Sequence, residues 1–334
     1  MDFKILFFMG KGGVGKTTCA AAFALRAALK RRTLIVSLDP AHNLGDVLGV
    51  GLGDEPRKVA ENLYAIEVDF EKMINDHLKA LADEIKDIYG YLKVLNLDRY
   101  VDVLRYSPGI EEYATLDKIM EILRDNVKTK SYDIIVFDTP PTGLTLRTLA
   151  LPSISAIWIE KLMELREAIL DRRRIIEDIT GEKAKVVIRG RELEVASEKE
   201  RDPIYKELLK MKKDIDFVNS IIKNPKTSIA VLVVNPEALP ILEAKRALDF
   251  LAKIGINVQY IVVNKVLEAR AEESLPRELR VRLSQERKAL RLVDEYFDKQ
   301  VKIRVPMLYE EPKGLEKLKA FSEHLAKLVD SLVA

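Results

Sequence analysis

The residues with the clearest chemical meaning lie near the start of the chain, where positions 10–17 read Gly-Lys-Gly-Gly-Val-Gly-Lys-Thr. This segment fits the phosphate-loop pattern G-x-x-x-x-G-K-[ST], whose glycines let backbone N–H groups close around phosphate oxygens. We expect Lys16 to reach the β- and γ-phosphates of a nucleoside triphosphate and the Thr17 hydroxyl to ligate Mg²⁺. The residues expected to surround the nucleotide here are Gly10, Lys11, Gly12, Gly13, Val14, Gly15, Lys16, Thr17 and Thr18.

A second lysine, Lys11, stands early in this loop, where an ordinary phosphate loop has no need of one because Lys16 already serves. The form K-G-G-x-G-K-T resembles the deviant phosphate loop of a class of ATPases that includes the Min-type, Par-type, nitrogenase iron-protein and arsenite-pump families. In that class the early lysine crosses a dimer interface to the partner's nucleotide, so the resemblance implies a closed homodimer in the ATP-bound state. The alternative is that Lys11 is only a solvated charge of the loop.

Two aspartates, Asp39 and Asp138, each end an apolar run rich in Ile and Val. A carboxylate at the C-terminal end of a parallel strand points into the crevice where such sheets bind ligands. We expect Asp39 to orient or deprotonate the attacking water. Lys11 and Lys16 are the other candidate catalytic residues. We expect Asp138 to hold Mg²⁺, directly or through water. Taken singly, each aspartate could equally cap a helix, but their occurrence on two strands beside a phosphate loop favours catalysis.

The elements that must position these residues follow an alternating pattern, in which runs rich in Val and Ile are separated by amphipathic stretches. The expected strands are 3–9, 33–38, 64–68, 132–137, 228–234, 258–263 and 301–305. Between them, amphipathic helices are expected over two long stretches, with a short hairpin around 186–195. The predicted fold class is α/β: a mostly parallel sheet of phosphate-loop NTPase type, wrapped by helices, with an inserted helical subdomain. The nucleotide-binding core is expected over about 1–69, 129–150 and 226–334, and the inserted subdomain over about 70–128 and 151–225.

Composition excludes several classes of function. The 334 residues carry 55 Lys and Arg against 53 Asp and Glu, and this balance gives no push toward nucleic acid or an anionic membrane. No apolar run approaches the roughly 20 residues of a membrane span, so we expect a soluble, cytoplasmic protein. The single cysteine, Cys19, excludes an intramolecular disulfide, a Cys-x-x-Cys zinc site and the iron–sulfur cluster of a nitrogenase-like reductase.

The assembled motifs resemble those of the arsenite-pump ATPase family, and within it most of all the ATPases that deliver tail-anchored membrane proteins. The resemblance covers nearly the whole chain. Its most specific parts are two segments similar to the switch regions of the family, Asp39-Pro40-Ala41-His42-Asn43-Leu44 and Asp138-Thr139-Pro140-Pro141-Thr142-Gly143-Leu144-Thr145-Leu146-Arg147. From the phosphate loop and the two strand-end aspartates, we expect loss of the γ-phosphate to relax residues 39–46 and 138–145. Further matching segments are 107–112, 234–237, 263–266 and 305–315.

The resemblance also implies roles for residues in the second half of the chain. Asn264 is similar to the asparagine that reads adenine in this family, and its amide can pair with the adenine edge through one donor and one acceptor. Pro306 and Met307 belong to a segment that resembles the family's adenine-packing loop. Apart from the resemblance, Asn264 could merely cap a turn at the end of a strand.

By resemblance, the helical subdomain would bind a hydrophobic client, the membrane segment of a tail-anchored protein, and pass it on at a membrane receptor. ATP binding would close the homodimer and hydrolysis would open a client groove between helices. Candidate lining residues are Met73, Met120, Ile154, Ile157, Trp158 and Met163. For any single one of them, a place in the core of the helical bundle is the favoured interpretation.

The chain also departs from the family. It has no cysteine in the helical region, so soft As(III) would find no thiolate ligands there, and it has no zinc-binding cysteine pair. The ATPase subunit of a metalloid efflux pump and a spatial-organisation ATPase of the Par or Min type remain as alternatives. We expect ATP and Mg²⁺ as cofactors, no zinc, and no nucleic-acid partner.

Overall fold

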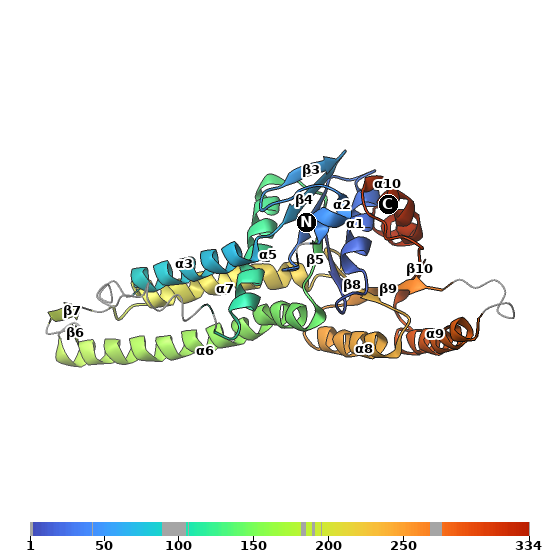
Figure 1. Cartoon of the computed structure of the whole chain (residues 1–334). Helices are drawn as coiled ribbons and strands as arrows, with labels where there is room; N and C mark the ends of the chain where they lie inside the picture. Colours follow the sequence, from blue (N-terminus) through green and yellow to red (C-terminus); the bar gives the residue numbers. More distant parts are fainter. Residues whose placement is uncertain are drawn as a thin grey trace. The chain divides into compact units, whose positions relative to one another are not determined.

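An eight-stranded sheet with the strand order β10-β9-β8-β1-β5-β2-β4-β3 organises the computed structural model (Figure 1). The strands are β1 (Lys4–Met9), β2 (Thr33–Ser37), β3 (Arg57–Ala60), β4 (Leu63–Glu67), β5 (Ile134–Asp138), β8 (Ser228–Val234), β9 (Val258–Val266) and β10 (Val301–Pro306). Every neighbouring pair is parallel except β3 and β4 at one edge. The predicted α/β fold with a mostly parallel sheet is therefore confirmed. The structure describes residues 3–41, 43–88, 105, 107–181, 185–188, 191–194, 196–267 and 276–333.

Strand β1 lies in the middle of the sheet, with β5 on one side and β8 on the other. The chain leaves β1 toward β2, which lies beyond β5, and later returns to β8 on the opposite side, so the strand order reverses at β1. In open parallel sheets, ligands bind at the carboxyl ends of the strands at such a reversal. The phosphate loop directly after β1 therefore occupies the place where this topology provides a crevice.

The helices of the sheet region are α1 (Lys16–Ala27), α2 (Leu44–Leu48), α5 (Ile110–Thr129), α8 (Ala238–Lys253), α9 (Arg277–Tyr296), α10 (Leu315–Ser322) and α11 (Ala326–Val333). Figure 1 shows α1 and α10 on one side of the strands and α8 and α9 on the other. Apolar side chains of α1, α10 and α11 share one buried cluster with the sheet, and Phe8 packs on Phe23 with ring centroids 5.7 Å apart. The C-terminal helices α10 and α11 therefore pack on the sheet.

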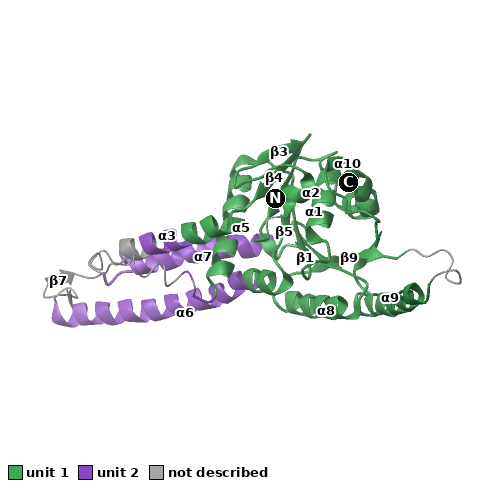
Figure 2. Ribbon diagram, viewed as in Figure 1, with its two compact units in different colours: residues 1–76, 109–149, 222–334 green, residues 77–108, 150–221 purple. Residues whose placement is uncertain are grey.

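Two compact units divide the chain (Figure 2). Unit 1 comprises 1–76, 109–149 and 222–334 and contains the sheet, while unit 2 comprises 77–108 and 150–221 and is largely helical. Helix α5 belongs to unit 1, although the sequence analysis placed its residues in the helical insertion. An amphipathic pattern shows that a helix buries one face, but it does not say whether a sheet or another helix covers that face.

Unit 2 is formed by parts of α3 (Phe70–Ile88), α6 (Thr142–Thr180) and α7 (Pro203–Ile222), with the hairpin β6 (Lys185–Ile188) and β7 (Arg191–Glu194). The two hairpin strands pair antiparallel, as predicted, and the turn 189–190 lies outside the described residues. Helix α7 begins with Pro203 after Asp202, whose Oδ1 accepts the Tyr205 N–H at 2.7 Å. A capping aspartate followed by proline is a typical helix start.

One local prediction differs from the structure. The sequence analysis found no strand at 57–60, because the sequence Arg-Lys-Val-Ala lacks an apolar run; an edge strand such as β3 tolerates charged residues because one of its sides is unpaired. Gly143, from the second segment that resembles a switch region, lies in the first turn of α6, and its expected relaxation stays a prediction. No helix within the described ranges is both long and apolar enough to span a membrane.

Candidate nucleotide site

The phosphate loop joins β1 to α1 with the backbone conformation that its glycines permit. Gly13 and Gly15 have φ angles of 83° and 91°, a region that residues with a Cβ rarely adopt. A Cβ at Gly15 would lie 2.3 Å from Nδ2 of Asn264, and one at Gly10 would lie 2.4 Å from the Val233 carbonyl oxygen. The first helical residue of α1 is Lys16, so the loop ends at a helix N-terminus, where free N–H groups attract anions.

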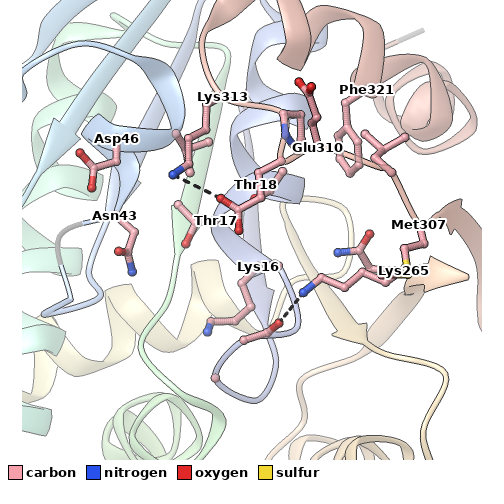
Figure 3. Close-up of a pocket in the computed structure, with 18 of the residues that line it drawn as sticks. Lys16, Thr17, Thr18, Asn43, Asp46, Lys265, Met307, Glu310, Lys313 and Phe321 are labelled. Carbon is pink, nitrogen blue, oxygen red and sulfur yellow. Dashed lines mark hydrogen bonds and ion pairs between the residues drawn. The ribbon is translucent and has the colours of Figure 1, made fainter.

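A cavity of about 680 Å³ opens beside the loop (Figure 3). Most residues predicted to bind nucleotide line it: Gly12, Gly13, Gly15, Lys16, Thr17, Thr18, Asp39, Asn264, Pro306 and Met307. Three predicted loop residues, Gly10, Lys11 and Val14, are not among its lining residues. The structure thus brings together residues from the first and last quarters of the chain around one space of the size that a nucleotide needs.

Lys16 and Asp39 face each other inside this cavity. The Lys16 ammonium lies 3.8 Å from Oδ2 of Asp39, and both side chains are largely buried. The other carboxylate oxygen of Asp39 accepts the N–H of Ala41 at 3.1 Å, which holds the side chain at the end of β2. A lysine can bind phosphates and a carboxylate beside it can orient water, so this pair is suited to phosphoryl transfer to water.

Asp138 ends β5 and is completely buried, and neither carboxylate oxygen has a hydrogen-bond partner among the described residues. Burial raises the pKa of this carboxyl to about 7, although the nearby Thr17 hydroxyl and Lys16 ammonium act to lower it. A buried carboxylate without a partner is costly unless a cation or water satisfies it. Asp138 beside Thr17 therefore offers the oxygen ligands that Mg²⁺ prefers, and these residues fit that ion.

Glu67 is a site residue that the sequence analysis missed. It ends β4, and its Oε1 accepts the backbone N–H groups of Leu44 and Gly45 at 2.9 and 3.2 Å. These are the first N–H groups of α2, so Glu67 fixes the segment that follows Asp39. The signal was present, because Glu67 lies near the carboxyl end of the predicted strand 64–68, as Asp39 lies just after the predicted strand 33–38.

Asn264 lies at the end of the sheet nearest the loop and is buried. Its Nδ2 donates to the Val14 carbonyl at 2.8 Å, which leaves a second N–H and the amide oxygen of its side chain without a partner that the structure records. Lys265, the next residue, also lines the cavity, and its Nζ donates to the Gly13 carbonyl at 3.1 Å. The sequence analysis gave Lys265 no role.

Lys11 lies outside the cavity. Its ammonium pairs with Oε1 of Glu243 on α8 at 3.1 Å, and its side chain is 46% exposed. The lysine therefore points away from the space that would hold this chain's own nucleotide.

The structure describes most of the two segments that resemble switch regions, and it records hydrogen bonds in the second. His42 lies outside the described residues. In the second segment, the Thr139 hydroxyl donates to the Phe8 carbonyl at 2.9 Å, and the Thr145 hydroxyl donates to the Pro140 carbonyl at 2.7 Å. Arg147 follows on α6 and pairs with the largely buried Glu112 of α5.

Comparison with known proteins agrees with this site. A family model described as anion-transporting ATPase matches residues 3–327. A protein of Aquifex aeolicus named "Putative arsenical pump-driving ATPase 2" is 31% identical over 325 residues, which cover 96% of this chain and 99% of the relative. Proteins named "ATPase GET3" from Ajellomyces dermatitidis and Blastomyces gilchristii are each 32% identical over 324 residues, which cover 96% of this chain and 89% of each relative. These matches, which extend over nearly the whole chain, show that the chain is an ATPase of the anion-transporting ATPase family.

Proposed function

We propose that this chain is a Mg²⁺-ATP-dependent, homodimeric, cytoplasmic ATPase that shields the membrane segments of tail-anchored proteins and targets them to a membrane receptor. The proposal follows the sequence resemblance to ATPases with this role, and two of the relatives are GET3 ATPases. The single observation that carries it is a row of exposed apolar side chains on α6, in unit 2.

The row consists of residues spaced so that they share one face of a helix: Ile154, Ile157, Trp158, Leu162 and Leu165. Ile157 and Trp158 are 64% and 66% exposed. Of the candidate groove residues, Met73 is buried and thus part of the core, whereas Ile154, Ile157 and Trp158 are exposed, contrary to the core placement that the sequence analysis favoured for each. A contiguous exposed apolar face is a feature of surfaces that bind an apolar partner.

In the proposed reaction, Lys16 and the N–H groups of the phosphate loop bind the β- and γ-phosphates, and Asp39 orients water for attack on the γ-phosphate. Mg²⁺, held by Thr17 and by Asp138 directly or through water, would neutralise charge on the phosphates. Asn264 would pair with the adenine edge through its remaining donor and acceptor, and Pro306 and Met307 would pack on the base. The Lys16 ammonium and the Asp39 carboxylate lie 3.8 Å apart, so one γ-phosphate could be within reach of both groups.

Homodimerisation would use Lys11. Its exposed side chain, which is not among the residues lining the chain's own cavity, supports a role on the nucleotide of a second copy. Replacing Lys11 with Ala should leave MgATP binding intact while the protein stays monomeric in MgATP, measured by sedimentation velocity. A Glu243→Gln control, which removes only the ion-pair partner, should still dimerise. A closed dimer of the Lys11→Ala protein would contradict the assignment.

The client is tested by capture. The Asp39→Asn protein, which should hold ATP without hydrolysing it, is co-expressed with a tail-anchored membrane segment or with a control segment in which the apolar residues are replaced by Ser. If a dimer purified in MgATP carries the apolar segment but not the Ser-substituted control, the targeting function is supported. An ATP-bound dimer that carries neither segment would overturn the client assignment and leave the ATPase in place.

A metalloid-pump function is the second candidate, because one relative is named an arsenical pump-driving ATPase. Burial raises the pKa of the Cys19 thiol to about 12 and leaves its side chain inaccessible. Since As(III) binds thiolates, and this chain has no other cysteine, arsenite should not stimulate hydrolysis. Stimulation of the steady-state ATPase rate by arsenite would favour the pump.

A further inference from the structure

Strand β9 carries an irregularity at the residues that reach the phosphate loop. Against β10, Val263 lies opposite Arg304 and Val266 lies opposite Pro306, so two residues of β9 face one of β10 between these pairs. The extra residue makes a β-bulge at Asn264 and Lys265. Bulges are rare between parallel strands and re-aim side chains, often next to active sites.

The bulge lets two consecutive side chains reach the same target. In a regular strand, neighbouring side chains point to opposite faces. Here Asn264 donates to the carbonyl of Val14 and Lys265 donates to the carbonyl of Gly13, at 2.8 and 3.1 Å. Lys265 has a φ of 61°, which is unfavourable for a residue with a Cβ, so the surrounding structure must hold it there. The dashed line at Lys265 in Figure 3 marks its contact.

These two hydrogen bonds act on the orientation of the loop's N–H groups. In a trans peptide the C=O and the following N–H point in opposite directions. The Gly13 carbonyl shares a peptide with the Val14 N–H, and the Val14 carbonyl shares one with the Gly15 N–H. Because both carbonyls point toward Asn264 and Lys265, both N–H groups point away from those two side chains. The Val14 N–H makes only a long contact, 3.5 Å, with the Lys11 carbonyl, so it keeps most of its capacity to donate to an anion.

We propose that Lys265 is a positioning residue of the nucleotide site: its ammonium holds the Gly13 peptide so that the phosphate loop is arranged for phosphates before the nucleotide arrives. The inference rests on the assignment of the cavity to nucleotide made above. Because the arrangement serves phosphate binding in general, it acts equally on MgATP and MgADP. It acts on affinity and not on the hydrolytic step, for which Asp39 and Lys16 are the candidates.

The test uses three substitutions that keep a Cβ, and hence the same backbone penalty, at position 265. Lys265→Met retains the aliphatic stem without the ammonium, Lys265→Ala removes both, and Lys265→Arg restores a cationic donor. Lys245→Met is the matched control, because Lys245 lies on α8 and pairs with Asp249 away from the cavity. Titration calorimetry gives the Kd for MgATP and MgADP, and steady-state kinetics give kcat and KM separately.

Loss of a hydrogen bond from a charged donor predicts that Lys265→Met weakens binding of both nucleotides by about tenfold and raises KM similarly, with kcat within about twofold of the original. Lys265→Ala should lose as much nucleotide affinity as Lys265→Met, and Lys265→Arg should recover most of it. The melting temperature of each variant without nucleotide should equal that of the original protein. Unaltered affinity in Lys265→Met would overturn the inference, as would a loss confined to Lys265→Ala, which would assign the effect to the stem. If the unsubstituted protein fails to bind MgATP, the proposed function itself fails.

Discussion

The two units of this molecule use apolar and charged side chains in opposite ways. In unit 1 the strand residues Ile5 to Met9 are fully or almost fully buried, and the charged side chains of Lys16, Asp39 and Lys265 line one cavity. In unit 2 the helices α6 and α7 are joined by ionic contacts, while large apolar side chains of α6 stay exposed.

The clearest ionic contact of unit 2 joins Arg166 and Asp202, whose two hydrogen bonds measure 3.0 and 2.6 Å. Lys212 and Glu160 pair at 2.6 Å, and the Tyr205 hydroxyl donates to Glu167 at 2.8 Å. Directional polar contacts can join two helices and leave their apolar faces exposed. A sheet core is held together by burying apolar side chains, so it cannot leave them exposed. The comparison suggests that unit 1 is built to hold fixed chemical groups and unit 2 to keep apolar surface available.

The largest effect should come from unit 1 alone. Asp39→Asn removes the carboxylate proposed to orient water, so hydrolysis should fall by about 10²- to 10⁴-fold while MgATP binding stays near normal. Asp249→Asn on the surface of α8 is the control and should hydrolyse ATP at the original rate. Steady-state ATPase assays and calorimetry measure the two quantities. An Asp39→Asn protein with the original rate would remove Asp39 from its role.

The next effect should be confined to unit 2. Asp202→Ala leaves the Arg166 guanidinium without its buried partner and removes the cap of α7, which should cost about 3 kcal/mol of local stability. Hydrogen exchange of peptides from 160–175 and 203–215 should report this loss, while peptides from β1 and β5 keep their protection. Asp171→Ala, which breaks an exposed pair with Arg174, should change protection by less than about 0.5 kcal/mol. Equal loss in both units would contradict the comparison.

The same carboxyl predicts a dependence on pH. Burial raises the pKa of Asp202, but hydrogen bonds from Arg166 and from the Tyr205 N–H outweigh it, so the pKa lies below its usual range. A lowered pKa means that Asp202 contributes its full stability above the ordinary value of about 3.9 and loses it as the pH falls through the lowered value. The difference in unit 2 protection between the original protein and Asp202→Ala should therefore be constant near neutral pH and shrink below about pH 4. A difference that grows on acidification would show the opposite sign.

The smallest stability effect should come from the exposed apolar row. Ile157→Ala should change unfolding free energy by less than about 0.5 kcal/mol, whereas Ile159→Ala, two residues along and only 8% exposed, should cost about 2–4 kcal/mol. In the capture experiment the exposed positions should matter instead. A double variant that combines Ile157→Ser and Trp158→Ser should recover less of the apolar segment than the original protein does. Undiminished capture by that double variant would separate the row from the client.

Much of the nucleotide site was predictable from the sequence because each part follows a strand end. The phosphate loop, Asp39 and Asp138 all come directly after apolar runs, and a parallel sheet brings such ends to one edge. Lys265 was not predictable, because its contact with Gly13 depends on a bulge and on a left-handed φ that no local pattern announces.

The sequence by itself determined the class of fold, the phosphate loop and the family, because the spacing of glycines, charged residues and apolar runs reflects local geometry that repeats in every such loop and strand. Only the tertiary structure decided which apolar residues of α6 are exposed, that α5 belongs with the sheet, and that Lys11 points away from the chain's own cavity. These outcomes depend on which surfaces pack together over long separations in the chain. Periodicity marks a face as apolar, but burial requires a partner for that face, and the partner is chosen by the fold as a whole.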